Sequence, residues 1–352
     1  MRLDRIVPGR PARADLTGAV LARDLRVGSA RWAKGRRLDA ADLDALASAS
    51  PAEVGAASIT VLLMEAGDLH EDEAALRLAA AVAGPGLEQR GPNESRLDLV
   101  AMHAGVAHIR VREVELLDRI DPLEVFTVLD GSVVAAGQLV ASVKVAPHVV
   151  ASSVVERGVA IARAGRRPLA WVAPFVPMRV GVLVKESLRA ADRERFERSV
   201  RAKVESLGST VVRFEYVADE EADVETALAS MTTRTSDAVD VVLTAGGRST
   251  DPGDPFFLAL ERVGGRLIRR GVPAHPGSML WLGRVRRTAV LGLPTCGAYS
   301  KATAADLLLP RLLTGEPPSL RTVSRLGHGG ILTRDMRFRF PAYARELEAP
   351  EG

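Results

Sequence analysis

The sequence predicts an α/β protein, with a mostly parallel sheet covered by helices on both faces in the C-terminal half and a β-rich module before it. After Pro177, short apolar runs alternate with amphipathic segments, which is the pattern of repeated βα units. Between residues 105 and 150, the segments are instead short, rich in β-branched residues and divided by turn signals. These two patterns place the two fold types in different parts of the chain.

The first hundred residues are expected to mix helices and strands. Residues 18–25 fit a short helix or strand. Residues 38–46 fit a helix with Asp39 as its N-cap, because apolar residues recur at 38, 43 and 46. Residues 58–64 predict a strand from their β-branched content, and residues 72–82 predict a helix.

The β-rich module begins with residues 108–114, whose apolar and polar residues alternate with period two and so predict a strand. Residues 124–129 predict another strand. Asp130-Gly131 follows it and indicates a hairpin continuing into residues 133–145. A helix is expected over residues 154–164, and the prolines at 168, 174 and 177 indicate a stiff linker.

The C-terminal half is expected to form the parallel sheet. The apolar run 180–184 suits a strand that is buried on both faces. Further strands are predicted at 210–214, 239–244, 288–293 and, in the tail, 335–340. Helices are predicted at 192–207, 221–233, 254–263 and 299–313. The domain boundaries that follow are 1–104, 105–150, 151–177, 178–316 and 317–352.

Composition limits the function classes. Lys and Arg number 47 and Asp and Glu 44, for a net charge of +3. Basic and acidic residues are interleaved, whereas a nucleic-acid partner calls for a concentrated basic stripe with aromatics. The single cysteine, Cys296, excludes a disulfide framework or a multi-cysteine metal site. With no signal peptide and no apolar run of about 18 residues, we expect a cytoplasmic protein without a membrane partner.

The first candidate site follows the predicted strand 239–244. In an open parallel sheet, ligands bind beyond the carboxyl ends of the strands. Glycines let the backbone approach a ligand closely, and free N–H groups, hydroxyls and a guanidinium suit a phosphate. The loop supplies all of these with Thr244, Gly246, Gly247, Arg248, Ser249 and Thr250.

Two carboxylates complicate this loop, because they repel a bare phosphate. Asp251 and Asp254 could hold a metal ion, bind the donor edge of a pterin ring, or cap the helix expected after them. For Asp254, capping is as good an explanation as function. For Asp251, function is the better one.

The second candidate site follows the strand 288–293. Pro294 forces a turn, and Ser300 and Lys301 then lie in the first turn of a helix, where the helix dipole favours phosphate. Lys301 is as well explained by simple exposure. Cys296 is more simply a small core residue than a nucleophile.

Three other residues invite a functional role but have simpler explanations. His70 lies among acids at the start of a helix, where capping explains it better than metal binding, because no second histidine has ligand spacing. His275 fits a solvated loop as well as a ligand contact. Trp281 is better explained by packing than by stacking on a pterin.

The order of motifs in the C-terminal half resembles the molybdopterin-binding (MoaB/Mog-like) domain found in molybdopterin molybdotransferases and related proteins. The motifs are Thr244-Ala-Gly-Gly247, an Asp-bearing loop, Ala274-His-Pro-Gly277 and Val290-Leu-Gly-Leu-Pro294, across about residues 178–315. The resemblance implies that Glu186 joins Asp251 and Asp254 as catalytic residues. It also implies that Pro276, Gly277, Pro294, Thr295, Ser300 and Lys301 join the first loop in binding the cofactor.

The resemblance implies a function in molybdenum cofactor biosynthesis or handling. The ligand would be molybdopterin or its adenylylated form, with molybdate and Mg²⁺ as further reactants, and the protein would be a homo-oligomer. One hypothesis is a molybdotransferase-like enzyme. Another is a non-catalytic carrier or sensor, which the missing Asp-x-Ser-Ala-Met-Asp-Gly segment of molybdotransferases favours. A nucleotide hydrolase of the competence-damage-inducible type ranks behind both.

Overall fold

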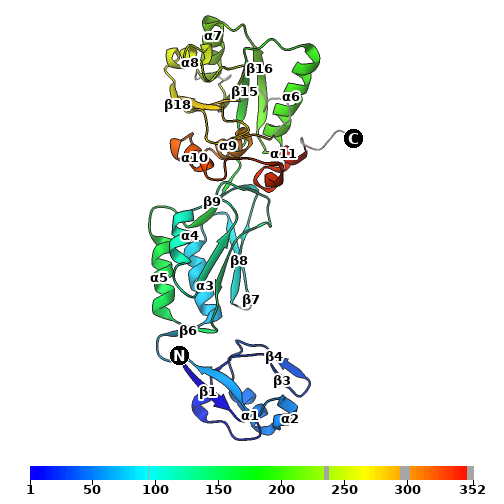
Figure 1. The fold of residues 1–352 in the computed structure, drawn as a ribbon, viewed down its shortest axis with the longest axis vertical. Coiled ribbons are helices and arrows are strands. Elements are labelled where there is room, and N and C mark those ends of the chain that lie inside the picture. Colours follow the sequence, from blue (N-terminus) through cyan, green and yellow to red (C-terminus); the bar gives the residue numbers. More distant parts are fainter. Residues whose placement is uncertain (94, 234–237, 294–301, 347–352) are drawn as a thin grey trace. The chain divides into compact units, whose positions relative to one another are not determined.

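The computed structural model describes residues 1–93, 95–233, 238–293 and 302–346 (Figure 1). The chain forms two compact units, each assembled from several stretches. Unit 1 comprises residues 1–103, 107–130 and 135–172, and unit 2 comprises residues 104–106, 131–134 and 173–352. No helix among the described residues is long and apolar enough to cross a bilayer.

Unit 1 begins with a small α/β region and continues into a four-stranded antiparallel sheet of order β10-β12-β8-β7. Its helices are α1 (Ala40–Ser48), α2 (Pro51–Val54), α3 (Glu71–Val82), α4 (Val111–Leu117) and α5 (Ser152–Arg163), with the 3-10 turn η1 (Ala14–Leu16). Its first strands are β1 (Arg2–Ile6), β2 (Val20–Leu21), β3 (Leu25–Val27), β4 (Ala30–Trp32), β5 (Ile59–Leu63) and β6 (Asp68–His70). The later strands are β7 (Leu87–Asn93), β8 (Arg96–Ala101), β9 (Gly105–Ile109), β10 (Leu123–Thr127), β12 (Leu139–Val145), β13 (Val149–Ala151) and β14 (Ala170–Pro174).

Several predicted elements of unit 1 are confirmed. Asp39 caps α1 through a reciprocal capping box with Asp42, which satisfies two backbone N–H groups at the helix start. Strand β5 and helices α3 and α5 lie where β-branched content and helical spacing placed them. The segment 168–177, expected to be a linker, contains strand β14, whose Ala170 and Val172 are buried.

The strand predicted over residues 108–114 is wrong beyond Ile109. Strand β9 ends there, and α4 begins at Val111. The period-two pattern misled because Val114 and the fully buried Leu117 also have the three-residue spacing of a helix. Tertiary burial of Leu117 therefore selects the helix.

The tight hairpin turn predicted at Asp130-Gly131 is also wrong, although residues 123–127 and 141–145 do pair antiparallel, as the predicted strands would. Gly131 does adopt a positive φ of 89°, so a turn is present. However, β10 pairs with β12, whereas β11 (Val133–Val134) pairs with β9, so the turn connects strands of different sheets. The Asp130 carboxylate accepts a hydrogen bond from the Ile109 N–H at 2.9 Å, which ties the turn to β9. This long-range bond has no local sequence signal.

Unit 2 contains the predicted doubly covered sheet, with strand order β16-β15-β17-β20-β19-β18. Strands β15 (Arg179–Val184), β16 (Thr210–Tyr216), β17 (Val241–Ala245) and β20 (Thr288–Gly292) are parallel. Strands β18 (Arg266–Arg270) and β19 (Trp281–Val285) extend the sheet in antiparallel fashion. The sequence pattern did not reveal these last two, since β18 is rich in arginine and lacks an apolar run.

Helices cover both faces of this sheet, as Figure 1 shows for α6 (Ala190–Glu205) on one side and α7 (Glu221–Thr232) and α8 (Pro255–Arg262) on the other. Phe196, Val200 and Val204 of α6 share one core cluster with alternate residues of β15 and β17. Leu183, Val242 and Val290 point to the opposite face and pack with α7 and α8. Burial on both faces explains the uninterrupted apolar runs of these strands.

The C-terminal part of unit 2 is helical. Helix α9 (Ala305–Leu312) contains Pro310 and begins later than expected. It is followed by α10 (Leu320–Ser324), η3 (Arg325–Gly327), η4 (Arg334–Arg339) and α11 (Ala342–Glu346). The strand predicted over residues 335–340 is wrong, because these residues form 3-10 turns in which Phe338 is exposed and Phe340 is buried. Alternate residues there do not share one buried face, so no packing interaction stabilises a strand at these positions.

Candidate functional site

The carboxyl ends of β15 and β17 lie side by side, as the parallel sheet requires. Val184 pairs with Ala245, and the Lys185 N–H donates to the Ala245 carbonyl at 3.2 Å. Gly246 follows with a φ of +87°, and a Cβ there would lie 2.9 Å from the Glu186 Cβ. The structure therefore brings half-buried Glu186 against Gly246, as the predicted site needs.

The loop between β17 and α8 is closed by Asp254. Its carboxylate accepts hydrogen bonds from the Arg248 N–H at 2.6 Å and from the Phe256 N–H at 2.9 Å. The second bond makes Asp254 the N-cap of α8. Capping, one of the two explanations open for Asp254, is thus observed, and the buried carboxylate also fixes the curvature of the loop.

The other loop residues divide into exposed and buried groups. The side chains of Arg248, Thr250 and Asp251 are exposed, whereas Ser249 is buried. The Asp251 carboxylate accepts a hydrogen bond from the Gly253 N–H at 2.9 Å, which shapes the turn and leaves the side chain facing solvent. The predicted polar groups, from Arg248 to Asp251, therefore all lie on the single loop that follows β17.

Lys185 is a site residue that the sequence reasoning missed. Its side chain is fully buried, and its Nζ lies 2.5 Å from Asp219 Oδ1 and 2.9 Å from Asp254 Oδ2. Arg248 Nη2 lies 3.6 Å from the other oxygen of Asp219. A signal was present, because Lys185 is one of only five lysines and directly follows a buried strand. The two carboxylates are thus neutralised by two cations.

Thr244 provides a polar atom without an evident structural role. The residue is 1% exposed, and its Oγ1 has no hydrogen-bond partner among the residues that the structure describes. Thr244 alternates with Leu243 along β17 and so points to the same face as Val242, where Lys185 and Asp254 also lie. A buried hydroxyl without a partner costs about 1–3 kcal/mol, so its retention calls for an explanation.

The predicted contributors from residues 274–277 are held by other contacts. The backbone of His275 pairs with Gly330 and Leu332, and its side chain is exposed. Gly277 has a φ of +105°, and a Cβ there would lie 2.8 Å from the Ala304 N. A glycine is therefore required at position 277, directly after Pro276, because the backbone just before α9 lies too close to leave room for a side chain.

Several predicted site residues cannot be placed. Pro294, Thr295, Ser300 and Lys301 lie outside the described residues, as does Cys296.

Trp281 is buried against Phe256 and Phe257, with ring centroids 6.2 and 5.2 Å away, as expected for a packing residue. His70 caps α3 by accepting from the Asp72 N–H, as expected. No cluster of His, Cys, Asp and Glu among the described residues could hold a metal ion.

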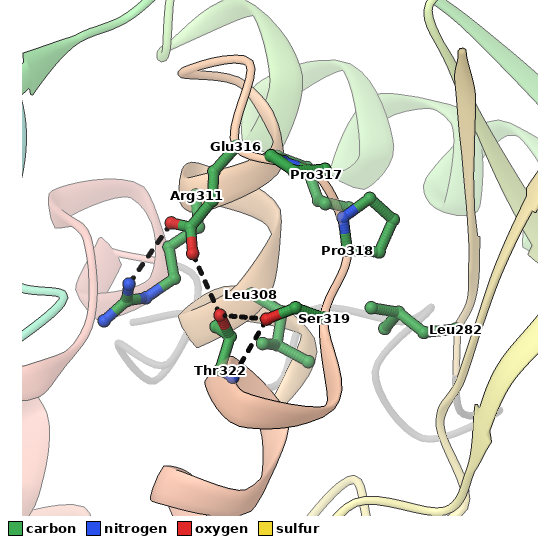
Figure 2. Close-up of a pocket in the computed structure, with 9 residues that line it drawn as sticks. Leu282, Leu308, Arg311, Glu316, Pro317, Pro318, Ser319 and Thr322 are labelled. Atoms are coloured by element: carbon green, nitrogen blue, oxygen red, sulfur yellow. Dashed lines mark hydrogen bonds and ion pairs between the residues drawn. The ribbon is translucent and has the colours of Figure 1, made fainter.

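A small hollow of about 10 Å³ lies between the end of α9 and the start of α10 (Figure 2). Its polar groups bind one another. Arg311 pairs with Glu316 at 3.2 Å, and the Thr322 hydroxyl donates to the same carboxylate at 2.9 Å. Ser319 and Thr322 complete the network at 2.8 Å. This arrangement fastens the turn between the two helices, so we do not assign it to a ligand.

Comparisons with known proteins bear on residues 185–314, which match the family model described as a probable molybdopterin binding domain. No curated protein matches the chain. Among solved structures, the molybdopterin biosynthesis enzyme MoaB of Thermus thermophilus is 20% identical, with 40% of this chain and 98% of that chain covered and a TM-score of 0.28.

Two further solved structures are similar. The molybdopterin biosynthesis MoeA protein of Pyrococcus horikoshii is 14% identical, with 74% of this chain and 81% of that chain covered and a TM-score of 0.30. A molybdenum cofactor biosynthesis protein B is 15% identical, with 44% of this chain and 98% of that chain covered and a TM-score of 0.30. Scores this low do not establish a common fold, whereas the family match concerns the loops described above.

Proposed function

We propose that this protein binds molybdopterin at the loop 244–254 and acts in molybdenum cofactor biosynthesis or handling, because residues 185–314 match the molybdopterin-binding family. The observation that carries this proposal is the Thr244 hydroxyl, which is buried at the carboxyl end of β17 and has no partner among the described residues. A ligand phosphate or pterin heteroatom would supply that partner.

The surrounding residues suit an anionic ligand. Gly246 and Gly247 allow close approach of the backbone, and the exposed Arg248 and Thr250 can donate to phosphate oxygens. Buried Lys185 and, at 3.6 Å from Asp219, Arg248 offset the charges of Asp219 and Asp254. We include Ser249, Pro276, Gly277, Pro294, Thr295, Ser300 and Lys301 in the proposed binding set on the family resemblance.

The carboxylates are proposed to act in different ways. Asp254 holds the loop and Lys185 in place, so any contribution to catalysis comes through positioning. Asp251 and Glu186 are the carboxylates proposed to face a reacting group. Asp254 does not fit a Mg²⁺ ligand, because two N–H groups and an ammonium already occupy its oxygens, so we derive no step through a metal.

A non-catalytic carrier or sensor is the second candidate. It is favoured by the same contacts, since Asp219 and Asp254 both already bind the Lys185 ammonium instead of being held open toward a substrate. A molybdotransferase-like activity would then rest on Asp251 and Glu186 alone.

Direct titration distinguishes the candidates. The purified chain is titrated calorimetrically with molybdopterin and with its adenylylated form, each with and without molybdate and Mg²⁺. Binding with AMP release that depends on molybdate would support the transferase. Binding without turnover would support the carrier, and no binding of either form would refute the proposed function.

The Thr244→Val variant tests whether the Thr244 hydroxyl contacts the ligand. It keeps the side-chain shape and removes the hydroxyl, so we expect unchanged or slightly higher stability with binding weakened about tenfold, as for one lost hydrogen bond to a charged group. Thr226→Val, at an exposed position of α7, is the matched control and should leave affinity unchanged. Equal affinity of wild type and Thr244→Val would contradict the proposed position of the ligand.

A further inference from the structure

The corner of the sheet formed by β18, β19 and β20 carries an unusual set of arginines. Residues 255–288 contain seven arginines and one acid, Glu261. Six of the arginines are exposed. Four of these six, Arg266, Arg284, Arg286 and Arg287, lie at one end of strands β18 to β20, and no acidic side chain among the described residues forms an ion pair with them. We call these four residues the arginine patch.

The arginine patch differs from the other arginine-rich surface of unit 2. On α6, arginines have acidic partners one turn away, as in the pairs Arg193–Glu197 and Arg198–Glu194 at 3.1 and 2.5 Å. In the patch, Arg266 is instead directly opposite Arg284 across two antiparallel strands. Like charges at such positions destabilise a sheet, because the side chains lie within about 5 Å at the Cβ atoms.

The turn between β19 and β20 breaks a second local preference. Arg286 and Arg287 are its two central residues, and Arg286 has a φ of +51°. Glycine, asparagine and aspartate are the residues that usually occupy such a position. The patch thus concentrates charge at the expense of both cross-strand pairing and turn chemistry, which is the expected mark of a surface kept for function.

The position of the arginine patch separates it from the loop 244–254. Thr244 pairs with Gly292 at the carboxyl end of β20, whereas the patch adjoins Thr288 at the amino end of the same strand. Four residues of strand span roughly 13 Å. A small ligand in the loop 244–254 does not reach across the sheet to the patch, so the patch serves a different partner.

We propose that the arginine patch docks an acidic segment of another protein. Four exposed guanidiniums at one corner of the sheet offer bidentate contacts to carboxylates, the geometry that arginine favours. Binding of single-stranded nucleic acid would call for stacking aromatics, and the aromatic side chains of residues 255–288 (Phe256, Phe257 and Trp281) are buried. Membrane binding would call for exposed apolar side chains, and Met279 is the only large exposed one among the described residues of 255–290.

The edge position of β18 supports this partner. Among the described residues, β18 has β19 as its single neighbour in the sheet (Figure 1). A protein segment can therefore approach Arg266 from the open side without displacing another strand. The docking is electrostatic, so it should weaken as salt screens the charges.

The test uses the full chain and a fluorescein-labelled poly-L-glutamate peptide, with binding measured by fluorescence anisotropy at low and at physiological salt. We expect salt-sensitive binding that is about tenfold weaker in the triple variant R284Q/R286Q/R287Q. The control R189Q/R193Q/R198Q removes the same charge from α6 and the residue before it, and should bind like wild type. The double variant R286Q/R287Q, confined to the exposed turn, repeats the test should Arg284 prove necessary for folding.

Three outcomes would overturn the proposal. Equal weakening in patch and control variants would show attraction to net charge alone. Tighter binding of duplex DNA or of phosphatidylserine vesicles than of poly-L-glutamate would assign the patch to another class of partner. Absence of poly-L-glutamate binding would remove the docking role. Molybdopterin affinity should be the same in all variants, so this test and that of the proposed function fail independently.

Discussion

At the scale of single residues, Lys185 sets the character of the candidate site. An unpaired buried ammonium would be strongly unfavourable, and here its Nζ contacts carboxylates from two different segments, Asp219 and Asp254. It therefore joins the end of β15 to the start of α8. The lysine also lies 5.3 Å from the centroid of the Phe256 ring, a cation–π distance. One side chain thus couples loop geometry and local charge.

Gly246 allows a second test at this scale. Its φ of +87° disfavours any side chain, and an added Cβ would lie 2.9 Å from the Glu186 Cβ. We expect Gly246→Ala to lower the free energy of unfolding by about 2–3 kcal/mol and to weaken ligand binding. Gly264→Ala is the matched control, since its φ is +72° but its Cβ would meet open space. Equal losses in urea denaturation would refute crowding at Gly246.

Asp118 gives a pH-dependent prediction. Partial burial raises the pKa of its carboxyl group, against a hydrogen bond from the Val125 N–H that lowers it. The folded protein therefore holds this proton more tightly than the unfolded chain does, so its contribution to stability is present in acid and is lost as pH rises through the raised pKa.

The variant Asp118→Asn keeps an acceptor for the Val125 N–H and removes the charge, which also lies unfavourably at the C-terminus of α4. We expect it to be more stable than wild type at neutral pH and equal to it in acid, below the ordinary pKa of Asp. Thermal melts across this pH range measure the difference. A gap that stays constant with pH would exclude the carboxyl group as its cause.

At the scale of elements, the sheet of unit 2 has two ends for which we propose different functions. The carboxyl ends of the parallel strands β15 and β17 hold the proposed ligand loop. The antiparallel extension β18–β19 carries the arginine patch at the opposite end of β20. The antiparallel strands thus add a charged edge to the sheet.

The pair formed by Arg266 and Arg284 allows this edge to be tested for stability. Arg266→Glu replaces a like-charge cross-strand pair by an opposite-charge pair, so we expect a gain of about 0.5–1 kcal/mol in the free energy of unfolding. Arg266→Gln should give a smaller gain. Both variants should weaken poly-L-glutamate binding. A loss of stability in Arg266→Glu would mean that the arginines do not repel each other in the folded protein.

At the scale of the whole molecule, unit 2 is not one continuous stretch of chain. Residues 104–106 and 131–134 belong to it, although they lie within the sequence of unit 1. Val133 packs against the core cluster of unit 2, and Val134 is 1% exposed. Arg311 closely approaches Gly131, where a Cβ would lie 2.5 Å from its Nη2. The stability of unit 2 should therefore depend on these inserted residues.

A fragment of residues 173–352 tests this dependence. It lacks the inserted valines, so we expect it to be less stable than unit 2 within the full chain by about 1–3 kcal/mol. Urea unfolding followed through Trp281 fluorescence measures both, with Trp32→Phe and Trp171→Phe in the full chain so that the same probe reports. Equal midpoints would show that the inserted residues add nothing to the fold of unit 2.

The sequence by itself determined the fold class of unit 2 and much of its candidate site. Buried parallel strands can be predicted from their apolar runs, and α6 and α7 can be predicted from the helical spacing of their apolar residues, because each pattern is local. Glycines and hydroxyls after β17 indicated a candidate ligand loop for the same reason. Strand β18 carried no such pattern, since arginine at a sheet edge is locally indistinguishable from a loop.

Only the tertiary structure decided the rest. The ion pairs of Lys185 with Asp219 and Asp254 join residues 34 and 69 positions apart, and the Asp130–Ile109 bond joins different sheets. The cross-strand pairing of Arg266 with Arg284 likewise depends on register. Such contacts depend on where distant segments meet, and local periodicity carries no information on that meeting, because it records only which face of an element is buried.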